Sequence, residues 1–230
     1  MILITSSDGS SIQNAVDQIQ DGGTIYLQGN FKLKKNITIN KNLTISGMNN
    51  TVLDGNINLD GIIICEKSSD VTLENLAITN GGGGVIIRKG SNVKIISCDI
   101  YENYRFLGGG ILSHADTLTL MSCDIHNNAA MLGKGGGIYL EGGTVTITDC
   151  NITDNTAAVC GGGLDASKAT ITMQNCTITG NKSVWGGGIN LINLGTKLTA
   201  ISCDISGNTA SISSPDISLQ SGATYEEVNE

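Results

Sequence analysis

The chain has 230 residues, of which 40% are hydrophobic and only 3% are aromatic. Its 13 basic and 21 acidic residues give a formal net charge of −8, which argues against nucleic acid or an anionic membrane as a partner, because both require clustered positive charge. The sequence has no run of about 18 apolar residues, so we expect no membrane-spanning segment.

The first segment predicts a short amphipathic helix. Its apolar residues recur at helical spacing on one stripe: Ile12, Ala15, Val16 and Ile19. A capping box from Ser10 to Gln13 is expected to begin the helix, and Gly22 and Gly23 are expected to end it. Residues 1–23 are therefore interpreted as an N-terminal cap that covers the open end of the repeats that follow.

The rest of the chain is built from a repeated unit. Aligned on a cysteine, successive copies are 25, 27, 26 and 27 residues apart, with an isoleucine two residues later and an asparagine five residues later. A glycine triplet then begins the next unit. The aligned residues are Cys98, Cys123, Cys150, Cys176 and Cys203, and Asn103, Asn128, Asn155, Asn181 and Asn208. A fixed period of this length is typical of stacked repeat architectures.

Each unit contains short runs in which apolar and polar residues alternate. Val145 and Ile147 show this two-residue period, which is typical of strands with one buried face. Equivalent positions match after one full unit rather than in mirror order, which argues against hairpins. We therefore predict a coil of parallel strands stacked about 4.8 Å apart over residues 24–210, with residues 211–230 as a partial last rung or a tail.

Stacking turns each repeated residue into a ladder along the coil axis. Asparagine amides can donate to and accept from the rungs above and below, while the cysteines and isoleucines are expected to fill a narrow interior. The cysteine spacing contains no Cys-x-x-Cys pair, which argues against zinc. Ladder cysteines about 4.8 Å apart exceed the roughly 3.8 Å between the Cβ atoms of a disulfide, so buried free thiols are predicted.

The unit Cys-x-Ile-x-x-Asn-x-Ala followed by Gly-Gly-Gly-Ile resembles the repeats of right-handed parallel β-helix proteins. The resemblance is to the polymorphic outer-membrane proteins of chlamydiae and the adhesin-like surface proteins of methanogenic archaea, whose pattern is Gly-Gly-Ala-Ile and Phe-x-x-Asn. Here Gly110 and its equivalents replace the alanine, and Ile100 and its equivalents replace the phenylalanine. The resemblance covers about residues 8–210 and implies an all-β, right-handed parallel β-helix of about eight rungs. It also implies an extracellular or cell-surface domain, here expected to be excised without its signal peptide.

Many parallel β-helix proteins cleave acidic polysaccharides, so catalysis is the second interpretation. Hydrolysis or elimination needs carboxylates that converge on one cleft. Asp99 and Asp124 follow neighbouring ladder cysteines and are expected side by side on one outer face, the nearest approach to a catalytic pair. Aspartates on any solvated strand would give the same pattern. The other outward row that we expect reads Leu112, Tyr139, Asp165 and Asn190.

Neither a metal nor a cofactor is expected. His114 and His126 are the only histidines, one in a turn and one at an outward strand position, and nothing in the sequence supplies the further ligands of a shared site. The glycine triplets lack the Gly-Lys-Ser/Thr of a phosphate-binding loop.

The turn between each asparagine and the next glycine triplet varies most between units, as YRFL, AMLGK, AVC and KSVW. Recognition is usually placed on loops that a rigid scaffold carries. The candidate binding residues in these turns are Tyr104, Phe106, Met131 and Trp185. The alternative is that these side chains pack back over the edge of the coil. The leading hypothesis is a non-catalytic, adhesin-like domain that binds a cell-surface protein or glycan; a polysaccharide lyase or glycoside hydrolase is second, and a structural spacer is third.

Overall fold

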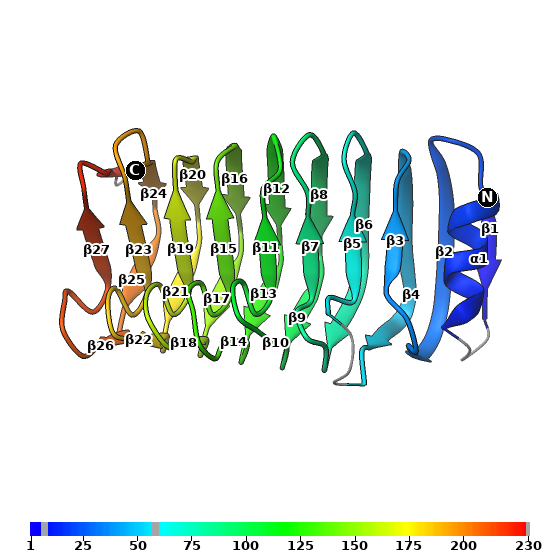
Figure 1. Cartoon of the computed structure of the whole chain (residues 1–230), viewed down its shortest axis with the longest axis horizontal. Coiled ribbons are helices and arrows are strands. Elements are labelled where there is room, and N and C mark those ends of the chain that lie inside the picture. Colours follow the sequence, from blue (N-terminus) through cyan, green and yellow to red (C-terminus); the bar gives the residue numbers. More distant parts are fainter. Residues whose placement is uncertain (6–8, 57–59, 229–230) are drawn as a thin grey trace.

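The computed structural model describes residues 1–5, 9–56 and 60–228, and its fold is a parallel β-helix with one short helix at the N-terminal end. Figure 1 shows the strands stacked along one long axis, with the two termini at opposite ends. Neighbouring strands pair in parallel in all three sheets. One sheet has eight strands, each from a successive turn of the coil, so the predicted all-β coil of about eight turns is confirmed.

The helix, α1, spans Ser10–Gln18. Sheet A has fifteen strands: β1 (Ile2–Ile4), β2 (Gly23–Lys32), β4 (Leu43–Asp54), β6 (Asp70–Thr79), β8 (Asn92–Ile96), β9 (Asp99–Tyr101), β12 (Thr117–Met121), β13 (Asp124–His126), β16 (Thr144–Thr148), β17 (Asn151–Thr153), β20 (Thr170–Gln174), β21 (Thr177–Thr179), β24 (Lys197–Ile201), β25 (Asp204–Ser206) and β28 (Thr224–Val228). Sheet B has eight: β3 (Ile37–Ile39), β5 (Ile63–Cys65), β7 (Val85–Ile87), β11 (Ile111–Ser113), β15 (Ile138–Glu141), β19 (Leu164–Ser167), β23 (Ile189–Ile192) and β27 (Ile217–Gln220). Sheet C has five: β10 (Tyr104–Arg105), β14 (Ala129–Ala130), β18 (Thr156–Ala157), β22 (Lys182–Ser183) and β26 (Thr209–Ala210).

Helix α1 packs against the N-terminal end of the coil, and all four residues of its apolar stripe are buried, as predicted. The predicted capping box is wrong: the N-cap is Gly9, which has no side chain to cap the first turn. Gln13 instead binds β3, where its Oε1 accepts from the Thr38 N–H at 2.8 Å and its Nε2 donates to the Thr38 carbonyl at 3.1 Å. The helix ends at Gln18, because the backbone of Ile19 is extended.

Sheet A divides at β6. One end of this strand pairs with β8 and the other with β9, so later turns carry two short strands where β2, β4 and β6 are single long ones. The residue before each ladder cysteine has a left-handed backbone, with φ between 50° and 53°: Ser97, Ser122, Asp149, Asn175 and Ser202. Asn and Asp reach this conformation more easily than most residues. The resulting bend separates the two strands, a role that sequence reasoning did not assign to this position.

The asparagine ladder is buried and continuous, as predicted. At each step the backbone N–H and the side-chain Nδ2 of one asparagine donate to Oδ1 of the next, as from Asn128 to Asn155 at 2.9 and 3.0 Å. The same Nδ2 donates to an isoleucine carbonyl of the previous rung, as from Asn128 to Ile100 at 2.8 Å. After Asn208 the ladder ends on Asp216, whose Oδ1 accepts at 3.0 and 3.2 Å. Sequence reasoning did not identify this carboxylate.

The ladder cysteines are free thiols, and four of the five are buried. Cys203, in the last of these rungs, is half-buried. Each thiol lies against the carbonyl two residues earlier, as Cys98 Sγ does at 3.4 Å from the oxygen of Ile96. Burial raises the pKa of Cys98 to about 12 and that of Cys176 to about 11. The predicted interior of buried thiols is therefore confirmed for all rungs but the last.

The outer face of sheet B is covered where we expected outward side chains. Three of the four residues of that row are buried, and only Tyr139 is half-buried. A Cβ on Gly161 would lie 2.3 Å from the Leu164 carbonyl oxygen, so the glycine triplet passes directly against the strand that follows it. The expectation of solvent-facing side chains was wrong because the glycines let the preceding turn approach this face so closely.

The end of the chain forms a further partial rung. Strand β27 pairs with β23, and β28 pairs with β24, each in the register of the earlier turns. Of the two alternatives for the last residues, the partial rung is therefore the one observed.

Candidate functional site

The variable turns lie along one edge of the coil, beside sheet C at the bottom of Figure 1. All four predicted binding residues are exposed there: Tyr104 by 45%, Phe106 by 59%, Met131 by 64% and Trp185 by 36%. Three more exposed apolar side chains lie along the same edge: Leu132, Val159 and Ile212. We call these seven residues the apolar ridge. Leu132 and Val159 lie within the variable turns of the sequence, but sequence reasoning did not select them as binding residues.

Backbone hydrogen bonds hold the ridge turns in register. The Trp185 N–H donates to the Val159 carbonyl at 3.0 Å. β-Bridges also link Lys134, Cys160 and Trp185 across three successive turns. Because these turns belong to the stacked backbone, ridge side chains are held at intervals of about 4.8 Å along the axis.

The ridge concentrates the exposed apolar surface of the domain. Within the described residues it holds seven of thirteen exposed large hydrophobic side chains. The neighbouring Arg105 does not interrupt the ridge with a free charge, because its guanidinium pairs with Asp60 and donates to the Gly82 carbonyl at 3.2 Å. The edge therefore presents a row of exposed apolar side chains, with Lys134 and Lys182 in the same turns, on a chain whose net charge is −8.

The predicted carboxylate pair lies on β9 and β13, where Asp99 and Asp124 are neighbours across the two strands. The structure adds His126, whose Nε2 lies 2.9 Å from Asp99 Oδ1. The imidazole stacks on Tyr101 with ring centroids 5.3 Å apart, and its Nδ1 lies 2.9 Å from Asn127 Nδ2. Sequence reasoning placed His126 on the outer face but missed this pairing.

The two aspartates differ in environment. Burial raises the pKa of the Asp99 carboxyl; the contact with His126 opposes this rise, and the charge of Asp124 adds to it. Asp124 is exposed and accepts from Asn151 Nδ2 at 2.7 Å. A hydrogen-bonded carboxyl and imidazole can exchange a proton, which is the minimum needed for general acid or base chemistry.

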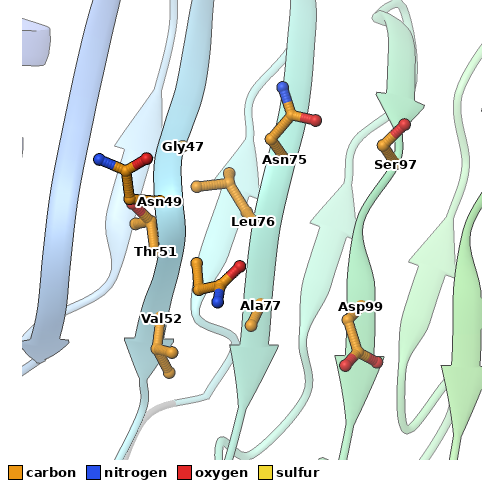
Figure 2. Close-up of a pocket in the computed structure, with 10 residues that line it drawn as sticks. Gly47, Asn49, Thr51, Val52, Asn75, Leu76, Ala77, Ser97 and Asp99 are labelled. Carbon is orange, nitrogen blue, oxygen red and sulfur yellow. The ribbon is translucent and has the colours of Figure 1, made fainter.

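A groove of about 480 Å³ opens beside Asp99, between β4, β6 and β9 (Figure 2). Strand β4 bulges there, because its pairing with β6 shifts register just before Thr51. Asn49 and Asn50 take up the extra length with left-handed backbones, at φ of 52° and 59°. The Thr51 hydroxyl donates to the Leu27 carbonyl at 2.7 Å and fixes the bulge. The groove therefore has Asp99 on its wall, while Asp124 lies one strand further along.

Within the described residues, no group of three or more His, Cys, Asp and Glu side chains could hold a metal ion. His114 has its own partner, with Nδ1 3.4 Å from Glu141 Oε2. In the same part of the chain, no helix is long and apolar enough to cross a membrane.

Comparisons with known proteins identify the family. A family model described as the right handed β-helix region matches residues 2–210. The chain is similar to the alginate lyase of Paenibacillus sp. str. FPU-7, with 14% sequence identity, coverage of 97% of this chain and 99% of that chain, and a TM-score of 0.47. So distant a likeness carries no argument about activity. No curated protein shows significant similarity. Because the family model spans most of the sequence, the chain belongs to the right-handed β-helix family.

Proposed function

We propose that the chain is a non-catalytic, adhesin-like surface domain that binds a partner protein through the apolar ridge. The exposure of seven large apolar side chains along one edge carries this proposal. Contiguous exposed apolar patches mark interaction sites on soluble proteins. The extracellular or cell-surface location is part of the same proposal and rests on the resemblance to adhesin-like repeats.

The composition of the ridge favours a protein over a glycan as the partner. Methionine and aromatic residues are enriched at the centres of protein interfaces. A sugar site also needs convergent polar groups that fix hydroxyls, and only Tyr104 and Trp185 in the ridge carry a side-chain polar atom. The stacked backbone holds the ridge in place before binding, which reduces the entropy lost on association.

The test compares two double variants of the labelled domain. Phe106→Ala/Trp185→Ala alters the ridge, and Met121→Ala/Leu194→Ala alters exposed apolar residues elsewhere. We expect the ridge variant to bind cell envelopes of the source organism at least about tenfold more weakly, and the control to bind like the wild type. Protease treatment of the envelopes should abolish binding, and both variants should melt within a few degrees of the wild type.

Three outcomes would contradict this proposal. Unfolding of the ridge variant would show that the side chains pack over the coil edge. Binding that survives protease treatment would favour a glycan partner. Equally weak binding by the wild type and both variants would leave the chain as a structural spacer.

Cleavage of an acidic polysaccharide is a second candidate, and the Asp99–His126 pair beside the groove favours it. A carboxyl whose pKa is raised by burial is suited to donate a proton. The binding proposal predicts that polygalacturonate keeps its chain length when it is incubated with the wild-type domain, as measured by size-exclusion chromatography. Depolymerisation that is lost on Asp99→Asn or Asp124→Asn would replace binding with catalysis.

A further inference from the structure

A second surface lies on the turns that join sheet B to sheet A, at the opposite edge from the apolar ridge (top of Figure 1). A groove of about 570 Å³ crosses five of these turns. Its floor is low because Ala115, Gly142 and Gly143 contribute no long side chain. Its walls carry four basic side chains: Lys67, Arg88, Lys89 and Lys168.

The charge of this groove is opposite to that of the chain. The four basic side chains are exposed, and none forms an ion pair within the described residues. Only two carboxylates, Asp116 and Glu141, face them in the groove, which leaves a surplus of two positive charges on a chain of net charge −8. Lys67 lies one turn, or about 4.8 Å, from Arg88 and Lys89, so these cations repel one another, and a bound anion would relieve that repulsion.

Lys168 has a backbone conformation that lysine disfavours, with φ at 55°. Glu141 pairs with Ser167, so Gly142 occupies the same place one turn earlier, with φ at 83°. Among the described residues, seventeen other than glycine have positive φ, and all are Asn, Asp or Ser except Lys168 and Glu102. Strained backbone conformations are often found at functional sites. The fold accepts glycine at this place, so the strain points to a role for the Lys168 side chain.

We propose that this groove binds an anionic polysaccharide. Its cations extend over five turns, roughly 19 Å, so one small anion cannot contact them all. Carboxylate or sulfate groups on the sugar chain would pair with Arg88, Lys89 and Lys168. Sugar hydroxyls would donate to Asp116 and Glu141, which accept hydrogen bonds beside the cations.

The same features argue against nucleic acid. No Phe, Tyr or Trp lines the groove to stack with a base. The proposal is independent of the apolar ridge, which lies at the other edge of the coil.

Ligands that share one backbone and differ in charge provide the first test. Dextran, carboxymethyl dextran and dextran sulfate are titrated into the wild-type domain by calorimetry. We expect the two charged polymers to bind, more weakly as salt is added, and neutral dextran not to bind. Equal binding of neutral dextran would overturn the proposal. So would binding of polyglutamate as tight as that of either charged dextran, because it would make the partner an acidic peptide.

Variants matched in charge provide the second test. Arg88→Gln/Lys89→Gln and Lys94→Gln/Lys182→Gln each remove two exposed cations, but only the first pair lies in the groove. We expect the groove variant to bind the better charged dextran at least about tenfold more weakly, and the control less than about twofold. Equal losses of affinity in the two variants would mean that binding depends only on the net charge of the chain, which would overturn the proposal.

A single variant separates the function of Lys168 from its structure. Lys168→Gly removes the charge and relieves the left-handed strain, so we expect weaker binding together with a melting temperature about 2–4 °C higher. Unchanged binding would remove Lys168 from the site. Phe106→Ala/Trp185→Ala should bind the charged dextrans like the wild type, which keeps this test separate from that of the ridge.

Discussion

The first three turns of the coil and the last five follow the same path around the coil but are built from different strands. Strands β2, β4 and β6 are unbroken over 10, 12 and 10 residues, whereas later turns divide them around a ladder cysteine. In the first turns, Phe31, Leu53 and Ile78 continue in register the row that Ile100 begins in the later ones. Within the described residues, sheet C and the asparagine ladder belong to the later turns alone.

This difference shows why the repeat is visible in only part of the sequence. Apolar packing requires a side chain of suitable volume, so several different apolar residues can serve at the same position. A hydrogen-bond ladder requires the same donor and acceptor in every rung. The last five turns therefore repeat the same residue types, while the first three repeat only their hydrophobicity.

The largest expected effect tests how little room the glycine triplets of the later turns leave. A Cβ on Gly162 would lie 2.4 Å from the Gly187 carbonyl oxygen and 2.5 Å from the Lys182 nitrogen, both backbone atoms. We expect Gly162→Ala to lower the free energy of unfolding by more than about 4 kcal/mol, measured by urea denaturation. Gly22→Ala, in the first turns, meets no atom within 4 Å and has φ at 76°, so it should cost about 1–2 kcal/mol. Similar losses in the two variants would show that the glycine triplet is no more crowded than Gly22.

The next largest effect tests polar geometry against apolar volume. Asn155 Oδ1 accepts two hydrogen bonds from Asn128, and its Nδ2 donates to the Ile125 carbonyl at 2.8 Å. Asn155→Leu leaves the buried Asn128 N–H without its acceptor, so we expect a loss of about 3–4 kcal/mol in the same assay, despite the greater hydrophobicity of leucine. Phe31→Leu, in the first turns, should cost only about 1–2 kcal/mol. A neutral Asn155→Leu would show that the ladder bonds contribute no stability.

Much of the fold could be predicted because each ladder residue recurs at a nearly constant spacing of 25 to 27 residues. The entry rungs were harder to align, since Phe31 and Leu53 share only their hydrophobicity with the isoleucines they continue. The bends were missed for a related reason: Ser97, Asp149 and Asn175 share a conformation rather than an identity.

The candidate sites were less predictable because they combine residues from different turns. The apolar ridge could be found from the sequence, because the turn that carries it varies most from one repeat to the next. Asp99 and His126 are 27 residues apart and meet only through the strand register. The groove between Arg88 and Lys168 depends on stacking several turns, and no single repeat contains it.

A smaller effect concerns the outer row of sheet B, which is apolar at Ile86 in the early turns and polar at Asp165 later. Asp165 Oδ1 accepts from Asn190 Nδ2 at 2.6 Å, while Oδ2 is buried and has no hydrogen-bond partner within the described residues. Burial raises the pKa of Asp165 to about 6, above its usual value of about 4. The fold therefore favours the protonated carboxyl.

This stabilisation is fully present below about pH 4 and is lost as the pH rises through about 6. We expect Asp165→Asn to raise the free energy of unfolding by about 2 kcal/mol at pH 8 and to leave it nearly unchanged at pH 4. Thermal unfolding at the two pH values measures the difference, with Glu226→Gln as an exposed control. A loss of stability at pH 8 would mean that the ionised carboxylate is stabilised in the fold.

The smallest expected effect compares the two ends of the coil and involves no loss of stability. Helix α1 covers the first turn, whereas Cys203 lies near the other end and is half-buried. Burial raises the pKa of Cys65, in the early turns, to about 12. This thiol is therefore protected from reagents both because it is inaccessible and because little of it is ionised to the reactive thiolate. We expect a thiol reagent at pH 8 to modify Cys203 first and the other six cysteines only as the chain unfolds, with Cys203→Ser removing the fast phase. Rapid modification of several thiols in the folded protein, or disulfides detected by mass spectrometry, would show that the ladder interior is neither closed nor reduced.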